Sequence, residues 1–354
     1  MYIDFERELA DQVCQSNLPF KKLDRKKILV TGCNGFIPSA FIRILNKVME
    51  NYGYKINFCG IARKNSKTRK NILRPLIREK KIKLLNVDIN KEFKLKYSPD
   101  YCLHGASVTA PKKYILNPIS VILPNSIGLI NTLKNLVNKN FKKFIFLSSS
   151  EVYGDFLKFK FKKKTFSEDD YGYIDCTNIN SNLALSKKFG ENYLYSWGKE
   201  YSINTNSVRL FHSYGPFMKL GDGRIHSDLV KDVIMKRNLR IKGNPKVKRA
   251  FCYISDVISG ILTVMFFGQN GESYNLANPK ETHSIMKIAE IIKKDQRNYY
   301  NIKITLNKDN KFKRNDFFYP EPSIKKIKKI GWQPKINARL GFINTINYFK
   351  KNKI

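Results

Sequence analysis

The sequence predicts an α/β fold, in which a doubly wound parallel sheet is followed by a smaller α/β lobe toward the C-terminus. Up to about residue 210, short apolar runs alternate with longer segments of helical periodicity. Strands that alternate with helices form parallel sheets covered on both faces. The right-handed crossover rule then favours a doubly wound arrangement. Beyond residue 210 the elements are shorter and more mixed, which favours a lobe packed on the carboxyl ends of the strands.

The elements of the first domain follow in chain order. For residues 1–25 we predict a helical extension. It consists of a short amphipathic helix, with Phe5, Leu9 and Val13 on one face, and a linker. Residues 26–210 predict the sheet domain. Its expected strands are Lys27–Thr31, Ile56–Ile61, Ile82–Val87, Tyr101–Leu103, Lys143–Leu147 and Ile203–Leu210, and its clearest helices are Ala40–Met49, Ser120–Val137 and Ser181–Glu200.

We predict that residues 211–354 form mainly a substrate-binding lobe and that residues 250–265 return to the first domain. In open α/β sheets the ligand binds in the crevice at the carboxyl ends of the strands, which is where this lobe is expected to lie. The expected lobe strands are Leu239–Lys242, Glu272–Leu276 and Asn301–Thr305, and the helices are Asp228–Lys236, Ser284–Lys294 and Phe342–Tyr348.

The composition indicates a cytoplasmic protein with a large core. The chain has 354 residues, of which 42% are apolar, and no run of about 18 apolar residues that would predict a membrane-spanning helix. The start, Met1–Ala10, carries three acidic residues and no apolar core of a secretory signal. The six cysteines show no CxxC or zinc spacing, so reduced thiols are expected, and the four histidines are too dispersed to predict a metal site.

The formal net charge of +37 has two interpretations. It is compatible with binding to nucleic acid or a membrane surface, or with a sequence that is simply rich in Lys, Asn and Ile. Lysines are spread along the chain in runs such as Lys160–Lys164 and Lys325–Lys329, and no aromatic-basic RNA-binding motif is present. We therefore expect neither a nucleic-acid nor a membrane partner, while anionic small ligands would benefit from the same field.

A glycine turn between the first strand and the first helix predicts a dinucleotide site of the Rossmann type. Glycine is needed at the tight turn and where the backbone approaches a pyrophosphate, and Gly32 and Gly35 fit these two roles. The helix N-terminus then offers N–H groups and a favourable dipole to the anion. The third glycine of the fingerprint is replaced by Pro38, which a first helical turn tolerates. The expected contacts of this turn are Gly32, Asn34, Gly35, Phe36 and Ile37.

The end of the second strand bears on the choice between NAD and NADP. An acidic residue at this place would bind the adenosine ribose, but the strand runs into Arg63 and Lys64. These cations would suit a 2′-phosphate, which favours NADP, although Arg63 would also stack on adenine. Asp88, after the third strand, is placed to accept from the adenine amino group.

Taken together, the motifs resemble the extended short-chain dehydrogenase/reductases of the nucleotide-sugar epimerase/dehydratase group, over roughly residues 26–345. Within that group they look most like UDP-glucuronate decarboxylases, with dTDP-glucose 4,6-dehydratases next. The matching segments are Thr31-Gly-x-x-Gly-Phe-Ile37, Asp88-Ile89, His104-Gly-Ala-Ser107, Asn117-Pro118 with Asn125, Ser148-Ser-Ser-Glu-Val-Tyr-Gly154, Ser186-Lys187, Arg209-Leu-Phe-His-Ser-Tyr-Gly-Pro216, Asp222-Gly-Arg224, Arg249-Ala-Phe-Cys-Tyr-Ile-Ser-Asp256, Asn275-Leu-Ala-Asn-Pro279 and Gly331-Trp-Gln-Pro334.

The resemblance implies a tightly held NAD that takes hydride from C4 of a UDP-linked sugar and later returns it. By motif position, Ser149 contacts the sugar O4 and Lys187 holds the nicotinamide ribose, with Ser150 and Glu151 as further catalytic positions. It also implies a homodimer formed through the helices at Ser120–Val137 and Ser181–Glu200. The remaining implied contacts are Asp88, Ile89, Ala106 and Asn125 for the cofactor, and His212, Arg224 and Arg249 for the substrate.

One departure lies inside this predicted active site. In the family a tyrosine four residues before the lysine is the base for O4, and here that position is Leu183. Loss of a general base costs about 10²–10⁴-fold in rate. Glu151, Tyr171 and Tyr173 are the nearby candidates to replace it. Three hypotheses follow. The first is an enzyme, either a decarboxylase or a 4,6-dehydratase or epimerase. The second is a catalytically silent partner or sensor that still binds the ligands, and the third is a basic nucleic-acid-binding derivative of the fold.

Overall fold

The computed structural model describes residues 4–63, 70–136, 141–156, 158, 163–296, 301–307 and 320–352. The side chains at positions 70, 71 and 112 are not described. Lys64, the second candidate for a 2′-phosphate contact, lies outside the described residues, as do Val137 and most of the run 160–164.

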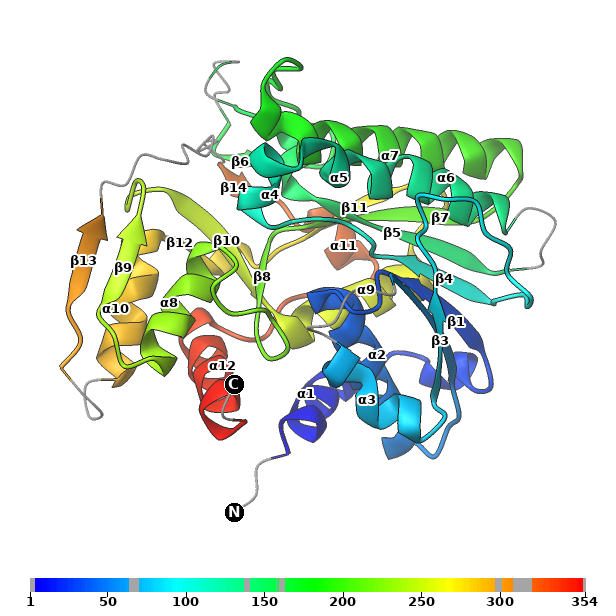
Figure 1. The fold of residues 1–354 in the computed structure, drawn as a ribbon, viewed down its shortest axis with the longest axis horizontal. Coiled ribbons are helices and arrows are strands. Elements are labelled where there is room, and N and C mark those ends of the chain that lie inside the picture. Colours follow the sequence, from blue (N-terminus) through cyan, green and yellow to red (C-terminus); the bar gives the residue numbers. More distant parts are fainter. Residues whose placement is uncertain are drawn as a thin grey trace.

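The centre of the molecule is a seven-stranded sheet whose pairings are all parallel (Figure 1). The strand order is β3-β2-β1-β4-β5-β7-β11. The chain adds strands outward in one direction from β1 to β3 and in the opposite direction from β4 to β11, as in a doubly wound fold. The predicted fold class is therefore confirmed. The strands are β1 (Lys27–Thr31), β2 (Asn57–Ala62), β3 (Ile82–Asn86), β4 (Tyr101–His104), β5 (Lys143–Ser149), β7 (Thr205–Leu210) and β11 (Ser273–Leu276).

The edge strand β11 corrects the sequence prediction. The run at 272–276 was expected among the strands of the lobe, but Ser273–Leu276 pairs with β7. The connection that brings the chain back to the sheet is α9 (Ile254–Phe267), which packs beside β5, β7 and β11. Residues 250–265, which were expected to return to the sheet domain, thus include most of the helix that carries the chain there.

Alternating residues of β1 explain why helices cover both faces of the sheet. Ile28 and Val30 belong to a large apolar core with residues of α2 (Phe36–Asn51) and α9. Leu29 points the other way, into a second core. That core is completed by residues of α6 (Ile127–Lys134) and α7 (Asn182–Glu200). Because successive side chains of a strand point to opposite faces of the sheet, helices pack on both faces and give the helix–sheet–helix layers of Figure 1.

The predicted helix at Ser120–Val137 is wrong as a single element. The chain instead forms α5 (Pro118–Ile122), a 3₁₀ turn at Leu123–Asn125 and then α6. Pro124 lacks the N–H that a continuous helix would need, which accounts for the break. The helix predicted at Ser181–Glu200 is α7, whereas α2 begins four residues before the expected Ala40. Two further helices were not predicted, α3 (Lys70–Arg78) and α4 (Pro111–Leu116).

In its described residues the lobe contains two small sheets and three main helices. One sheet has the order β12-β10-β8, and the other pairs β13 with β9. The strand expected at Asn301–Thr305 lies slightly later, at Ile304–Asn307. The elements are β8 (His212–Tyr214), α8 (Ile225–Ile234), β9 (Leu239–Lys242), β10 (Lys248–Tyr253), β12 (Thr282–Ser284), α10 (Ile285–Gln296), β13 (Ile304–Asn307) and α12 (Ala338–Lys351), with β6 (Thr165–Phe166), β14 (Glu321–Pro322) and α11 (Lys325–Lys329) elsewhere in the chain.

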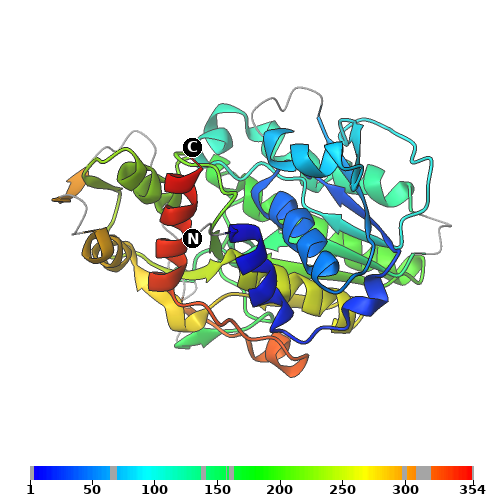
Figure 2. The same cartoon turned by 90° about the horizontal axis from the view of Figure 1, so that it is seen from below.

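The N-terminal helix α1 (Phe5–Cys14) is packed against the body of the protein. It begins at Asp4, whose carboxylate accepts from the N–H groups of Glu6 and Arg7. Its apolar face packs on α2 and α9 (Figure 2). Phe5 also meets Tyr348 of α12 edge-on, with ring centroids 5.6 Å apart. The first helix therefore contacts both the sheet domain and the last helix of the lobe.

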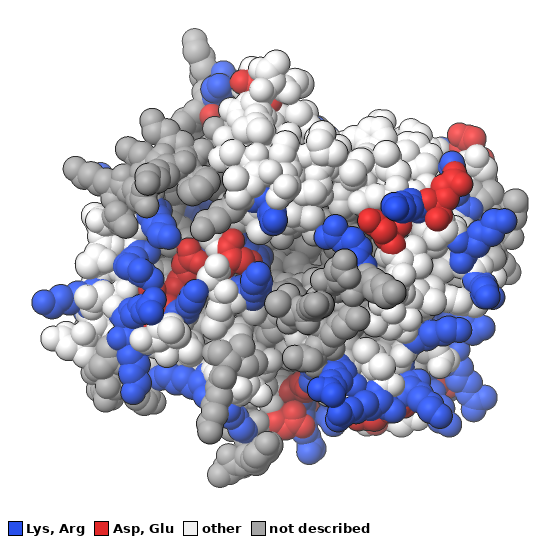
Figure 3. Space-filling model, in the orientation of Figure 1, with Lys and Arg blue, Asp and Glu red and all other residues white. Residues whose placement is uncertain are grey.

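Charged side chains are dispersed over the face drawn in Figure 3, where Lys and Arg are interspersed with Asp and Glu. All six cysteines are free thiols, four of them buried and Cys176 exposed. No helix in the described part of the chain is long and apolar enough to cross a membrane. Among the same residues, no group of three or more His, Cys, Asp or Glu is arranged to hold a metal ion.

Candidate functional site

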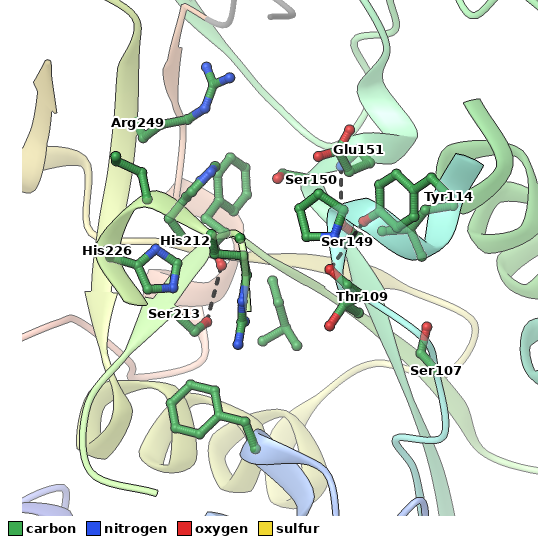
Figure 4. A pocket seen from close by; sticks show the side chains of 18 of the residues that line it. Ser107, Thr109, Tyr114, Ser149, Ser150, Glu151, His212, Ser213, His226 and Arg249 are labelled. Atoms are coloured by element: carbon green, nitrogen blue, oxygen red, sulfur yellow. Dashed lines mark hydrogen bonds between the residues drawn. The ribbon is translucent and has the colours of Figure 1, made fainter. Parts of the chain in front are cut away.

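A cleft of about 1160 Å³ lies between the sheet and the lobe. One wall follows the carboxyl ends of β1, β4, β5 and β7, and the other comes from α8, β9, β10 and the turns beside them. Figure 4 shows Ser149, Glu151 and Tyr114 on one side and His212 and Arg249 on the other. The cleft brings together the predicted residues Gly35, Phe36, Ile37, Ser149, Ser150, Glu151, Lys187, His212, Arg224 and Arg249.

Gly32 has the conformation that the turn after β1 requires. Its φ of +63° lies in the left-handed region, and a Cβ would lie 2.6 Å from the Cα of Ala106. Ala106 in turn donates its N–H to Thr31 Oγ1, at 3.3 Å. The turn is therefore held against the end of β4, and neither Gly32 nor Ala106 lines the cleft itself.

The start of α2 fits the pyrophosphate of a dinucleotide. Gly35 is the N-cap residue, and the N–H groups of Phe36 and Ile37 lie in the first turn, where no intrahelical carbonyl is available to them. A Cβ at Gly35 would be 3.0 Å from the Gly32 carbonyl oxygen, so the turn closes tightly at this point. Free N–H groups, the helix dipole and a close backbone are the features that hold a phosphate.

The predicted adenosine contacts lie at the same edge of the sheet but do not line the cleft. Arg63 is exposed, directly after β2, in the place where a ribose-binding acid would stand. Asp88 follows β3 and accepts from the N–H of Asn90 at 3.1 Å. Ile89 is buried, and its carbonyl oxygen accepts from Asn131. These residues fit a dinucleotide that would run from the glycine turn toward β3.

Ser149, Ser150 and Glu151 occupy the sharp turn at the end of β5. Ser149 caps a short 3₁₀ helix, and its Oγ accepts from the N–H of Glu151 at 3.2 Å. Because this bond uses a lone pair, the Ser149 hydroxyl hydrogen remains to be donated into the cleft. Ser150 is buried, whereas Glu151 is partly exposed.

Lys187 is buried on α7 at the floor of the cleft. Its Nζ donates to the carbonyl oxygen of Leu147, at 2.5 Å, and lies 4.5 Å from the centre of the Phe146 ring. Burial lowers the pKa of Lys187 to about 7, against the opposing effect of Glu191. One turn earlier on α7, Leu183 also lines the cleft, and it is only 3% exposed. The lysine of the family motif is thus in place, with an apolar side chain where the base is expected.

Asn125 lies behind α7, away from the wall of the cleft. Its Nδ2 donates to the Val121 carbonyl and to Ser186 Oγ, at 3.0 and 3.1 Å. Its buried Oδ1 has no hydrogen-bond partner in the described part of the structure. Asn125 therefore connects the 3₁₀ turn before α6 to the residue next to Lys187.

His104 completes a polar chain beneath the cofactor turn. Its Nε2 lies 3.1 Å from the carbonyl oxygen of Pro124, which can only accept, so this nitrogen carries the hydrogen. Its Nδ1 then accepts from Thr31 Oγ1, also at 3.1 Å. Burial and the charge of Lys187 lower the pKa of His104 to about 3, so the ring is neutral. His104 is therefore a neutral residue of the core at the end of β4.

The three predicted substrate residues differ in what they can offer. His212 lines the cleft from β8, with its ring centroid 5.9 Å from that of Phe251. Arg249, at the start of β10, extends toward the open part of the cleft (Figure 4). Arg224 is bound through Nε and Nη2 to the carboxylate of Asp222. Burial alone would raise the pKa of Asp222, but Arg224 holds it below its usual value.

Several residues that line the cleft were not predicted from the sequence, and Tyr114 is one of them. It comes from α4, and it is the one tyrosine among the residues that line the described cleft. Tyr171 and Tyr173, proposed as replacement bases, do not line it and are 50% and 38% exposed. Pro111 at the start of α4 was a signal for this helix, because proline is favoured in a first helical turn.

The family model described as NAD dependent epimerase/dehydratase family matches residues 28–277. The chain belongs to this family. Among its relatives, UDP-glucuronic acid decarboxylase 1 of Xenopus tropicalis is 29% identical over 330 residues, which is 93% of this chain and 73% of that protein.

Solved structures share the fold at lower identity. A UDP-glucose 4-epimerase from Thermotoga maritima, solved with UDP-glucose, matches with a TM-score of 0.77 and 21% identity, covering 93% of this chain and 100% of that one. A dTDP-glucose 4,6-dehydratase from Streptomyces venezuelae, solved with NAD, matches with a TM-score of 0.76 and 18% identity, covering 92% and 98%.

Proposed function

We propose that this protein is an enzyme that uses bound NAD to oxidise C4 of a UDP-sugar, with UDP-glucuronate as substrate and decarboxylation as the reaction. The observation that carries the proposal is the composition of a single cleft. It is lined by the phosphate-binding turn of α2, by Ser149, Glu151 and Lys187, and by Arg249 from the lobe. A relative that is named as a UDP-glucuronic acid decarboxylase supports the choice of substrate.

The chain's own residues have distinct tasks in this proposal. Ser149 donates its hydroxyl to the sugar O4, and Lys187 holds the nicotinamide ribose. Arg249 binds the diphosphate by charge-assisted hydrogen bonds. NAD supplies an acceptor for the hydride from C4. A ketone at C4 is β to the carboxylate of glucuronate, so CO₂ leaves while the ketone takes up the electron pair of the broken bond.

Ketone formation at C4 is common to three reactions. A 4-keto sugar also permits 4,6-dehydration, or return of the hydride to the other face of C4, which gives the epimer. One of the two solved structures is named as a 4-epimerase and the other as a 4,6-dehydratase. We rank these reactions second, because the matching decarboxylase covers almost the whole chain at higher identity.

A second candidate function rests on Leu183. An apolar, 3% exposed side chain occupies the position of the family's base. A protein that keeps the ligand-binding residues and lacks the base would serve as a silent partner subunit or a sensor of nucleotide-sugars.

Turnover and binding measured on the same sample separate the two candidates. Purified protein with NAD is incubated with UDP-glucuronate, UDP-glucose or dTDP-glucose, and products are analysed by chromatography and mass spectrometry. The first candidate predicts a product that has lost CO₂ from UDP-glucuronate, and strongly reduced product formation by Ser149→Ala, which lacks the hydroxyl that donates to O4. Thermal stabilisation by NAD and UDP-sugars with no product, even at high protein concentration, would favour the silent partner. Absence of stabilisation by either ligand would contradict both.

We further propose a homodimer formed through the helices above the sheet. Leu116, Ile119, Ile127 and Phe189 are 63%, 61%, 44% and 44% exposed and come from α4, α5, α6 and α7. Large apolar side chains exposed on neighbouring helices are typical of an interaction surface. We call these four residues the upper helical face.

A further inference from the structure

The side chain that packs against Leu183 is a tyrosine. Leu183, Tyr114 and Val121 form a small buried cluster that is separate from the two main cores. Leu183 and Tyr114 are each 3% exposed, and both line the cleft. A phenol is therefore present next to the position from which the family's phenol is missing.

Hydrogen bonds and packing hold Tyr114 in this place. Its backbone carbonyl accepts from Asn182 Nδ2 at 3.3 Å, which ties α4 to the first residue of α7. Its hydroxyl donates to the carbonyl oxygen of Thr109 at 3.4 Å. In Figure 4 the ring lies beside Ser149, and the hydroxyl points to the middle of the cleft. A bond of 3.4 Å is long for a hydroxyl donor and is therefore weak.

The other candidate bases are less well placed. The hydroxyl of Tyr171 accepts from Arg209 Nη2, outside the cleft, and the ring of Tyr173 lies under Lys158. The Lys187 Nζ donates to the Leu147 carbonyl and lies over the face of Phe146, and its proposed task is to hold the nicotinamide ribose. Glu151 does line the cleft, but it comes from the turn after β5 and is not part of the cluster around Leu183. Tyr114 is the candidate that both lines the cleft and packs with Leu183.

We propose that Tyr114 is the general base for the sugar O4, in the role that the family assigns to a tyrosine at position 183. The proposal rests on the function proposed above. Tyr114 acts as the phenolate, so its own hydroxyl proton first passes to water. The O4–H bond then breaks, and its proton passes to the phenolate oxygen of Tyr114. Bound NAD⁺ would accept the hydride that leaves C4, and the C4–O bond would become a carbonyl. Ser149, on the same wall, donates a hydrogen bond to O4.

The substitution Tyr114→Phe tests this directly, since phenylalanine keeps the packing on Leu183. Reduction of bound NAD is followed at 340 nm after mixing with UDP-glucuronate. We expect the rate to fall by about 10²–10⁴-fold, with the dissociation constant for UDP-glucuronate changed by less than about threefold. The matched controls Tyr171→Phe and Tyr173→Phe remove phenols outside the cleft, and they should react at the wild-type rate.

A rescue and a spectroscopic readout distinguish a base from a structural residue. The double variant Tyr114→Phe/Leu183→Tyr should react at least tenfold faster than Tyr114→Phe alone, because a phenol then returns to the neighbouring position. With 3-fluorotyrosine at position 114, the ¹⁹F signal should move when UDP-glucuronate binds. The acidic limb of the pH–rate profile should also shift to lower pH, because the fluorinated phenol is more acidic.

Three outcomes would overturn the proposal. A wild-type rate in Tyr114→Phe overturns it and leaves the proposed enzymatic function intact. A loss of affinity equal to the loss of rate assigns Tyr114 to binding alone. If wild-type protein binds UDP-glucuronate and NAD but shows no change at 340 nm with any UDP-sugar, the enzymatic function fails together with its base.

Discussion

The ring of Pro38 lies directly over Gly105, so that a Cβ at residue 105 would come within 2.4 Å of Pro38 Cγ. In the dinucleotide fingerprint the third glycine allows the helix to pack closely on the sheet. Here that glycine is replaced by proline, and the space is provided by Gly105 at the end of β4. The close approach is thus retained, with the small residue moved to the opposite side of the contact.

We predict that Gly105→Ala weakens NAD binding by at least tenfold and lowers the melting temperature. The added methyl group must displace Pro38, and with it the first turn of α2. The double variant Pro38→Ala/Gly105→Ala should recover most of the loss, because alanine has no Cγ at the point of contact. Calorimetric titration with NAD of the wild type, Gly105→Ala, Pro38→Ala and the double variant measures the coupling. Additive losses would show that the two residues act independently.

Arg63 is expected to set the preference between NAD and NADP. We predict that Arg63→Asp raises the ratio of the dissociation constants, NADP over NAD, by at least tenfold. The reason is that a carboxylate repels a 2′-phosphate and accepts from a free ribose hydroxyl. The control Lys83→Asp makes the same change of charge at an exposed position on β3. An unchanged ratio in Arg63→Asp would place the ribose away from this residue.

The burial of Lys187 predicts a dependence of stability on pH. Its pKa is about 7 in the folded protein, below its usual value of 10.5. Between these values the unfolded chain binds a proton that the folded protein does not, so this lysine's contribution to stability rises with pH. We expect the free energy of unfolding of the wild type, relative to Lys187→Met, to increase by up to about 1.4 kcal/mol per pH unit.

Urea denaturation of both proteins between pH 7.5 and 9.5 measures that difference. Lys199→Met, an exposed position on the same helix, controls for the removal of one positive charge. Parallel stability curves for the wild type and Lys187→Met would mean that Lys187 stays protonated in the folded protein.

The upper helical face predicts a change of oligomeric state on substitution. Placing charges at its centre with Ile119→Asp/Phe189→Asp should convert a dimer into a monomer, because the carboxylates would be buried without partners. Light scattering coupled to size-exclusion chromatography determines the mass. Leu340→Asp, a 43% exposed residue of α12 in the lobe, is the control and should leave the mass unchanged. A monomeric wild type would contradict the proposed dimer.

The sheet could be predicted from the sequence because its strands are short apolar runs with few alternatives. Lys27–Thr31 is the clearest case, since its boundaries match β1 at both ends. The membership of β11 could not be predicted in the same way. The choice of neighbour for a four-residue strand depends on the path of α9 over the sheet, and local periodicity contains no information on it.

The candidate site shows the same division. Gly32, Ser149 and Lys187 could be assigned because each stands in a motif with a fixed place relative to a strand or helix. Tyr114 was missed because α4 has only six residues, too few for a helical period, and no motif includes it. Its proximity to Leu183 depends on how α4 packs beside α7, which is a property of the tertiary structure.

The contacts of α1 have a consequence for the motion of the molecule. Its Phe5 meets Tyr348, and its Glu8 accepts from Asn344 Nδ2 at 2.9 Å, while the rest of the helix is packed on α2 and α9. The helix Phe5–Cys14 thus connects the sheet domain directly to α12 of the lobe. Any movement of α12 away from the sheet domain would have to break either the contacts of α1 with Tyr348 and Asn344 or its packing on α2 and α9.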